Sequence, residues 1–154
     1  ATKRGGLFLM SEDGTQTIHS FNESNSPLFS NNIQALEIND LTGEVYIATE
    51  LGLMGYKGTA ITANSLFSTL KVYPNPVRPG YNGNIAIRGT TENAEIKITD
   101  ANGRLIFSTT STGGQAVWNG YTISGNPVPT GIYYAFATSE DGYSSEKTKL
   151  LIIR

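Results

Sequence analysis

Few side chains in this sequence have the type and spacing of a catalytic or metal site. His19 is the only histidine and the chain has no cysteine, so zinc sites built from several histidines or from thiolates are excluded. A catalytic triad with a second histidine is excluded for the same reason. We interpret His19 as an ordinary strand residue.

Carboxylates occur in two pairs, Glu12-Asp13 and Glu140-Asp141, and each pair stands directly before a glycine. An Asp-Gly step supplies the positive φ angle of a tight turn, so the pairs indicate hairpin tips rather than a general acid and base. Asn39, Asp40 and Glu44 have oxygen ligands suited to calcium, but their spacing lacks the regular alternation of a calcium loop. We therefore expect no metal, no cofactor and no enzymatic activity in this chain.

The segment GGQAVWNG at residues 113–120 contains two glycines close together. No helix is predicted after it, so it lacks the helix N-terminus that would cradle a phosphate. We predict that Trp118 covers the core of a domain. The alternative is a half-exposed ring that stacks on a sugar.

Basic side chains offer another recognisable chemistry, because they suit phosphate or carboxylate groups. The predicted binding residues lie near the start of the second half of the chain, near a hairpin, and at the C-terminal end: Tyr73, Asn75, Arg78, Arg104, Lys147, Lys149 and Arg154. Residues 1–70 hold three basic and seven acidic side chains, and the remainder holds eight and six. Neither imbalance is the clustered basic face that nucleic acid requires, so we expect no nucleic-acid partner.

The pattern of apolar residues predicts an all-β protein, with short β-branched and aromatic runs between Gly, Asn, Asp and Pro clusters. An apolar content of 38% suits packed cores, and no run is long enough for a transmembrane helix. In the first part we predict strands at residues 6–10, 15–21, 33–38, 44–49 and 53–57. In the second part we predict strands at residues 71–73, 85–88, 95–99, 104–108, 115–118, 131–138 and 145–153.

Seven short strands in the second part match the size and patterning of an immunoglobulin-like β-sandwich. The strand TGIYYAFAT has apolar side chains on both faces, with Ile132, Tyr134 and Phe136 on one of them. We favour a central strand covered on both sides; the alternative is an outer face that meets a partner. Residues 59–70 pass from small and polar to apolar and predict a linker, so we divide the chain into residues 1–58, 59–70 and 71–154.

The opening of the chain echoes a later segment. Residues 1–3 align with residues 48–50 at an offset of 47, and Gly5 then falls on Gly52. A period in the forties is typical of propeller blades. The first part thus predicts an incomplete β-propeller of about one and a half blades.

Two stretches carry resemblances to known families. Residues 26–56, SPLFSNNIQALEINDLTGEVYIATELGLMGY, resemble the two-component-regulator propeller repeat, with Tyr46 at its usual Trp position and Ala48 at its usual Gly. This resemblance implies two outer strands of one blade within residues 6–21 and three strands of the next within residues 33–57. An unpaired blade edge would then be available for self-association.

The second part is similar to the C-terminal domain of proteins handled by the type IX secretion system of Bacteroidetes. The similar motifs are VYPNPV at 72–77, ITDANGRLIFS at 98–108, TGIYYAFAT at 130–138 and KTKLLIIR at 147–154. Residues 116–134 also resemble the immunoglobulin-like module of flagellar hook-capping proteins. A propeller that ends in such a domain resembles the PorZ-type family of surface proteins, which are understood to retain the domain.

These resemblances imply a non-enzymatic protein of the cell envelope, at the outer-membrane surface or in the periplasm. The C-terminal sandwich would serve in export, surface retention or docking to lipopolysaccharide, another anionic polysaccharide or surface proteins of the secretion system. The alternative is a periplasmic glycan-sensing or carbohydrate-binding propeller module.

Overall fold

The computed structural model describes residues 2–11 and 13–154. Ala1 of the repeat alignment and Glu12 of the first carboxylate pair lie outside the described residues. The chain forms two compact units, residues 1–58 and residues 59–154. The described residues form strands, turns and loops and no helix, which confirms the all-β class. It follows that none of them belongs to a helix long and apolar enough for a membrane crossing.

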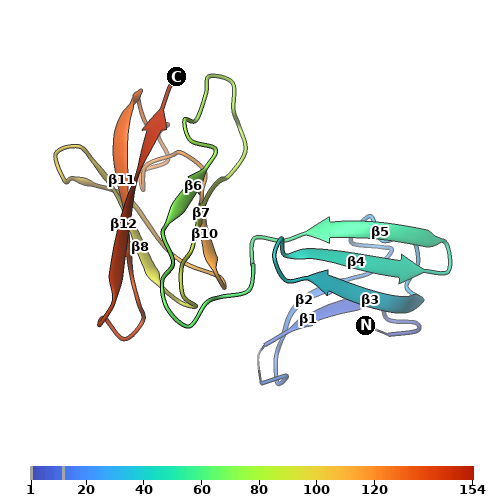
Figure 1. The fold of residues 1–154 in the computed structure, drawn as a ribbon. Helices are drawn as coiled ribbons and strands as arrows, with labels where there is room; N and C mark the ends of the chain where they lie inside the picture. Colours follow the sequence, from blue (N-terminus) through green and yellow to red (C-terminus); the bar gives the residue numbers. More distant parts are fainter. Residues whose placement is uncertain (1, 12) are drawn as a thin grey trace. The chain divides into compact units, whose positions relative to one another are not determined.

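The first unit contains a hairpin and a three-stranded meander, both antiparallel (Figure 1). The hairpin pairs β1 (Leu7–Met10) with β2 (Thr17–Phe21), and the meander has β4 (Glu44–Thr49) between β3 (Ile33–Asn39) and β5 (Gly52–Lys57). The small core of the unit consists of Leu7, Leu28, Ile33 and Ile47. The predicted division into two strands and then three is confirmed.

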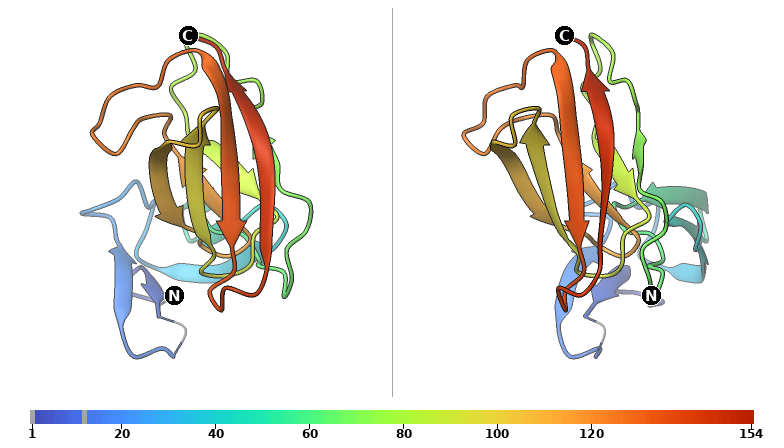
Figure 2. Two further views of the ribbon diagram at one scale, coloured as in Figure 1. Left: turned by 90° about the vertical axis from the view of Figure 1, so that its left-hand side faces the viewer. Right: turned by 60° about the vertical axis from the view of Figure 1, so that its left-hand side comes forward.

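The second unit is built from two antiparallel sheets. One has the order β10-β7-β6, from β6 (Lys71–Tyr73), β7 (Ile85–Arg88) and β10 (Gln115–Trp118). The other has the order β12-β11-β8-β9, from β8 (Glu95–Asp100), β9 (Leu105–Thr110), β11 (Gly131–Thr138) and β12 (Ser145–Ile152). Figure 2 shows the four-stranded sheet toward the viewer with the three-stranded sheet behind it. Every predicted strand is present, and no end differs by more than two residues.

One core lies between these two sheets. Both contribute fully buried side chains, such as Ile87 from the three-stranded sheet and Ile98 from the four-stranded one. Trp118 is also buried, and its ring lies 6.0 Å from that of Tyr133. Its indole N–H donates to the carbonyl of Tyr121 at 2.7 Å. The prediction that Trp118 covers the core is therefore confirmed, and the half-exposed alternative is wrong.

The prediction for the central strand β11 is only half right. The strand lies between β12 and β8, and its residues Tyr133, Ala135 and Ala137 are buried. Ile132 and Phe136 point the other way and are 48% and 40% exposed, so no described element of the second unit covers them. Apolar character on both faces of a strand did not distinguish a covered face from an open one. We call the open side the outer face.

Residues 59–70, which we predict as a linker, are part of the second unit and contact the rest of it. Phe67 and Leu70 pack on its core. Ile61 forms a β-bridge with Gly113, whose φ of 65° suits glycine. A side chain at position 113 would also collide with the carbonyl oxygen of Ile61. A glycine is therefore required where this segment crosses.

The C-terminal strand β12 is held along its edge by the segment after β6. The side-chain amide of Asn75 donates to the carbonyl of Lys149 at 3.1 Å, and its oxygen accepts from the amide of Leu151 at 3.0 Å. Val77 continues the contact, since its amide donates to the carbonyl of Leu151 and its carbonyl accepts from the amide of Ile153. Asn75 thus acts as a two-bond clamp on β12.

We predict that Ile98→Ala lowers the free energy of unfolding of the second unit by about 2–4 kcal/mol, because it leaves a cavity among fully buried side chains. Trp118 is the only tryptophan and lies in this core, so its fluorescence during urea unfolding reports the loss. The matched control Leu66→Ala, at an exposed position, should change the value by less than about 0.5 kcal/mol. Equal effects of the two substitutions would contradict the packing described.

We also predict that Asn75→Ala destabilises the edge of β12 by about 1–2 kcal/mol, because two hydrogen bonds are lost. Hydrogen exchange of the Leu151 amide should become faster. Asn102→Ala is the control, since no described hydrogen bond involves that side chain. Unchanged exchange at Leu151 would show that Asn75 does not hold the strand.

Candidate functional site

Strand pairing brings basic residues to one end of the second unit. Tyr133 pairs with Asp100 and with Leu150, so β11 begins where β8 and β12 end. The loop after β8, the segment after Val77 and the chain terminus meet at this end, because Val77 bridges to Ile152. We call this the basic end; its basic residues are Arg78, Arg104 and Arg154.

The opposite end of the same unit is acidic. It contains the loop before β8 and the turn between β11 and β12, because Thr138 pairs with Glu95 and with Ser145. Its carboxylates are Glu92, Glu95, Glu140, Asp141 and Glu146. The remaining carboxylate of the unit, Asp100, lies at the basic end. All carboxylates of this unit except Asp100 therefore lie at this end, which also contains the paired residues Lys71 and Arg88.

Arg104 is exposed and shares its charge with Asp100 in the hairpin between β8 and β9. Asp100 accepts from the amides of Arg104 and Asn102, both at 3.0 Å, and from Nε of Arg104 at 3.3 Å. The bond from the Arg104 amide is the main reason that the pKa of Asp100 lies below its usual value. The guanidinium group remains open to solvent, so it can still meet an anion.

Arg154 is used differently from the other predicted binding residues. Its guanidinium donates to the carbonyls of Gly120 at 3.1 Å and Val128 at 3.3 Å, and its amide donates to the hydroxyl of Thr130 at 2.8 Å. Part of its donor capacity therefore holds the loop between β10 and β11. Sequence patterns give no signal for this contact, because it joins residues distant in the chain.

Lys147 and Lys149 both lie on the outer face. In the pairing of β12 with β11, Lys149 is opposite Tyr134 and Lys147 is opposite Phe136. On the other side of β11, Lys97 of β8 is also opposite Phe136, and its ammonium lies 2.9 Å from the Glu95 carboxylate. Two predicted lysines are thus placed beside aromatic residues of the central strand.

The predicted binding residues do not form one cluster. Tyr73 is exposed on β6, Asn75 binds the edge of β12, and Arg78 is exposed beyond it. Sequence reasoning did not assign Ile132, Tyr134 and Phe136 to the site. The signal is the apolar character of both faces of their strand, from which we predict a covered strand.

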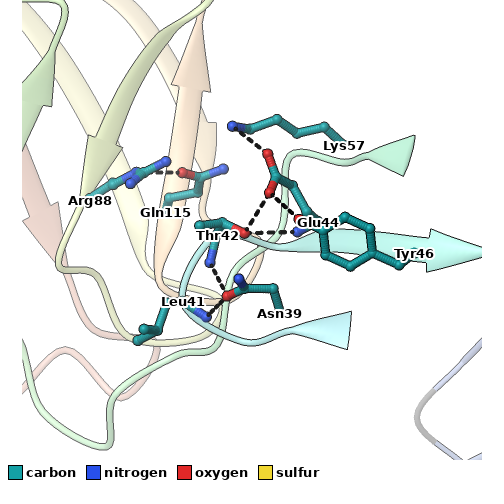
Figure 3. A network of polar contacts seen from close by, with 8 residues as sticks. All are labelled: Asn39, Leu41, Thr42, Glu44, Tyr46, Lys57, Arg88 and Gln115. Atoms are coloured by element: carbon teal, nitrogen blue, oxygen red, sulfur yellow. Dashed lines mark hydrogen bonds and ion pairs between the residues drawn. The ribbon is translucent and has the colours of Figure 1, made fainter. Parts of the chain in front are cut away.

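The oxygen-rich group of the first unit forms a hydrogen-bonded turn (Figure 3). The side-chain oxygen of Asn39 accepts from the amides of Leu41 and Thr42. The Glu44 carboxylate accepts from the hydroxyl of Tyr46 at 3.2 Å, which is the main reason that its pKa is lowered, and it also pairs with Lys57. Within the described residues no group of His, Cys, Asp or Glu is arranged for a metal ion.

Asp13 and Asp141, the aspartates of the two carboxylate pairs, also serve turns. Asp13 accepts from the hydroxyls of Ser11 and Thr15, and these bonds, with one from the Thr15 amide, lower its pKa to about 2. Asp141 accepts from the Ser139 hydroxyl, and this bond is the main reason that its pKa is lowered. Acids held ionised in this way are poor proton donors, so the turn interpretation is confirmed for both.

Elsewhere, within the second unit, Nε of Arg88 donates to the side-chain oxygen of buried Gln115 at 3.1 Å (Figure 3). Gln115 in turn donates to the carbonyl of Thr59. The hydrogen bonds of Gln115 therefore connect the start of residues 59–70 to the three-stranded sheet. Arg88 has a structural role in this contact.

Comparison with known proteins places this architecture in a family. A solved structure of PorZ, described as an essential bacterial surface component of the type-IX secretion system of Porphyromonas gingivalis, matches 98% of this chain at 36% identity and a TM-score of 0.61. The match covers 20% of the PorZ chain, so this chain spans about a fifth of its length. None of the curated protein sequences matches. The family model described as the secretion system C-terminal sorting domain matches residues 71–154, and the chain therefore belongs to that family.

Proposed function

We propose that this chain is the C-terminal part of a non-enzymatic cell-envelope protein associated with a type IX secretion system. The observation that carries the proposal is the match of residues 71–154 to the sorting-domain family. The similarity to PorZ over both units supports the same role. In this proposal the second unit directs export and then remains as a module that docks the protein at the outer-membrane surface.

We assign the second unit to the immunoglobulin-like sandwiches. Sheets of three and four antiparallel strands enclose one core, and the unit has the size expected of such a domain. A rigid sandwich can present its loops, edges and outer face without rearrangement. This property suits a docking module.

We assign the first unit to the last one and a half blades of a propeller. Both faces of the β3-β4-β5 sheet carry apolar side chains, with Ile47 and Met54 on one face and Tyr46 and Leu53 on the other. Sheets covered on both faces are expected where a blade stands between two neighbours. An open β5 edge would also allow copies of the chain to associate, as a secondary contact.

The docking partner in this proposal is an anionic polysaccharide such as lipopolysaccharide, or an acidic surface of the secretion machinery. The exposed charges of Arg78, Arg104, Lys147 and Lys149 support it, because none of these side chains is buried. Phosphate and carboxylate groups gain charge-assisted hydrogen bonds from such side chains. The carboxylates at the far end of the unit would direct the basic end toward the polyanion.

We predict that the double variant Lys147→Glu, Lys149→Glu binds dextran sulfate at least about tenfold more weakly than the unaltered chain, since each reversal costs on the order of 1 kcal/mol. The affinity is measured by calorimetry, with neutral dextran as the uncharged control polymer. Lys71→Glu is the matched control, because it reverses an exposed lysine on β6 of the other sheet.

An unchanged affinity in the double variant would remove these lysines from the docking surface. An equal loss in Lys71→Glu would show a general charge effect instead of a defined site. Trp118 fluorescence verifies that every variant is folded.

A further inference from the structure

The outer face carries an exposed apolar band close to the basic end. Leu151 and Ile132 are opposite each other on β12 and β11 and are 38% and 48% exposed. Leu105 on β9 is 45% exposed, and Ile123 on the adjacent loop is 68% exposed. We call Leu105, Ile123, Ile132 and Leu151 the apolar band.

The members of the band are tied to one sheet. Tyr134 of β11 and Leu105 of β9 both pair with Thr99 of β8. Leu105 therefore lies two strands from β11, in the row of Tyr134, which is adjacent to the row of Ile132. The amide of Ile123 donates to the carbonyl of Ile106 at 3.0 Å, which places the loop beside β9. Leu105 and Ile123 also line one shallow depression. The band residues therefore lie on β12, β11, β9 and the loop beside β9, and Thr99 of β8 lies between the two pairs.

Basic side chains follow the band in a fixed order along the strands. Lys149 lies one row from Leu151 on the same face, and Lys147 lies two rows away, with about 7 Å between rows. Arg104 stands directly before Leu105. The carboxylates Glu95 and Glu146 lie at the far end of the same strands. From the basic end, the first row of the outer face contains Leu151 and Ile132. The second contains Lys149, Tyr134 and Leu105, the third contains Lys147, Phe136 and Lys97, and Glu95 lies beyond them.

We propose that the apolar band and the lysines behind it dock onto a lipid surface with anionic headgroups. The order of the side chains matches a membrane interface, in which apolar groups enter the acyl boundary and lysines extend their charges to phosphates. Charge complementarity selects an anionic surface, since basic residues near it contribute about 1 kcal/mol each. The four band side chains are aliphatic and have no hydrogen-bonding group, so they suit acyl chains better than sugar hydroxyls.

This proposal does not depend on the proposed polysaccharide docking. Polysaccharide binding uses the basic side chains alone, whereas lipid docking also requires the apolar band. A substitution in the apolar band therefore distinguishes lipid docking from polysaccharide binding. The double variant Ile132→Thr, Leu151→Thr removes apolar surface, and threonine is a good strand former. The affinity of this variant for dextran sulfate should be unchanged.

The test is sedimentation of the full chain with vesicles of equal parts phosphatidylglycerol and phosphatidylcholine, compared with vesicles of phosphatidylcholine alone. We expect binding to the anionic vesicles that weakens as salt is raised. Ile132→Thr, Leu151→Thr should reduce the partition coefficient at least about tenfold, and Lys147→Gln or Lys149→Gln should each reduce it about fivefold.

Two controls keep the test decisive. Leu66→Thr and Lys71→Gln alter exposed residues of the same types away from the outer face and should retain full binding. If the double threonine variant does not fold, Ile123→Ser in the exposed loop replaces it, with a loss of at least about threefold expected.

Three results would overturn the proposal. The first is no binding to the anionic vesicles. The second is binding that the band variants leave unchanged, because that would be electrostatic adsorption alone. The third is an equal loss in the controls. If the unaltered chain bound the anionic vesicles but not dextran sulfate, the proposed function would be contradicted and lipid docking would remain supported.

Discussion

The alternation of β11 is the constraint on which the second unit depends. Because the strand is hydrogen-bonded on both sides, to β12 and to β8, its side chains must point alternately into the core and away from it. Tyr133, Ala135 and Ala137 are buried, and the small alanines leave room for large side chains of the facing sheet, such as Trp118. A slip of one residue would exchange the two sets, so packing of the core also determines what is exposed.

The exposed set forms the surface to which we assign docking. The register that buries Leu150 and Ile152 of β12 turns Lys149 and Leu151 outward beside β11. Asn75 then binds the backbone of β12 at these same positions. The lysines are thus carried by a strand that is held on both edges, which gives their charges defined positions. The stability of the domain and the surface that we propose for docking therefore depend on the same strand pairing.

Most of the fold was predictable because its determinants are local. Strand alternation and Asp-Gly or Asn-Gly turns occur within a few residues, and the turn at Gly103, with a φ of 81°, is an example. The carboxylate pairs were interpreted correctly for Asp13 and Asp141, since their partners lie within two residues. The exposure of Ile132 and Phe136 was not predictable, because it depends on what packs against a sheet from elsewhere in the chain.

The site was predictable only in part for the same reason. Basic residues near the chain end identified Lys147 and Lys149, but their apolar neighbours resemble core residues in sequence. The bonds of Arg154 to the carbonyls of Gly120 and Val128 join positions far apart in the chain, so a residue predicted to bind an anion has a structural contact.

We propose that the sorting-family domain remains in the working protein as a docking module. Intact mass and C-terminal peptide mapping of the full-length protein, recovered from its native cells, distinguish a retained domain from a removed one. We expect peptides of β11 and β12 to remain on the surface-located protein and the mature chain to include Arg154. A mature chain that ends before Lys71 would contradict it, because the domain would then act only as a transient export signal.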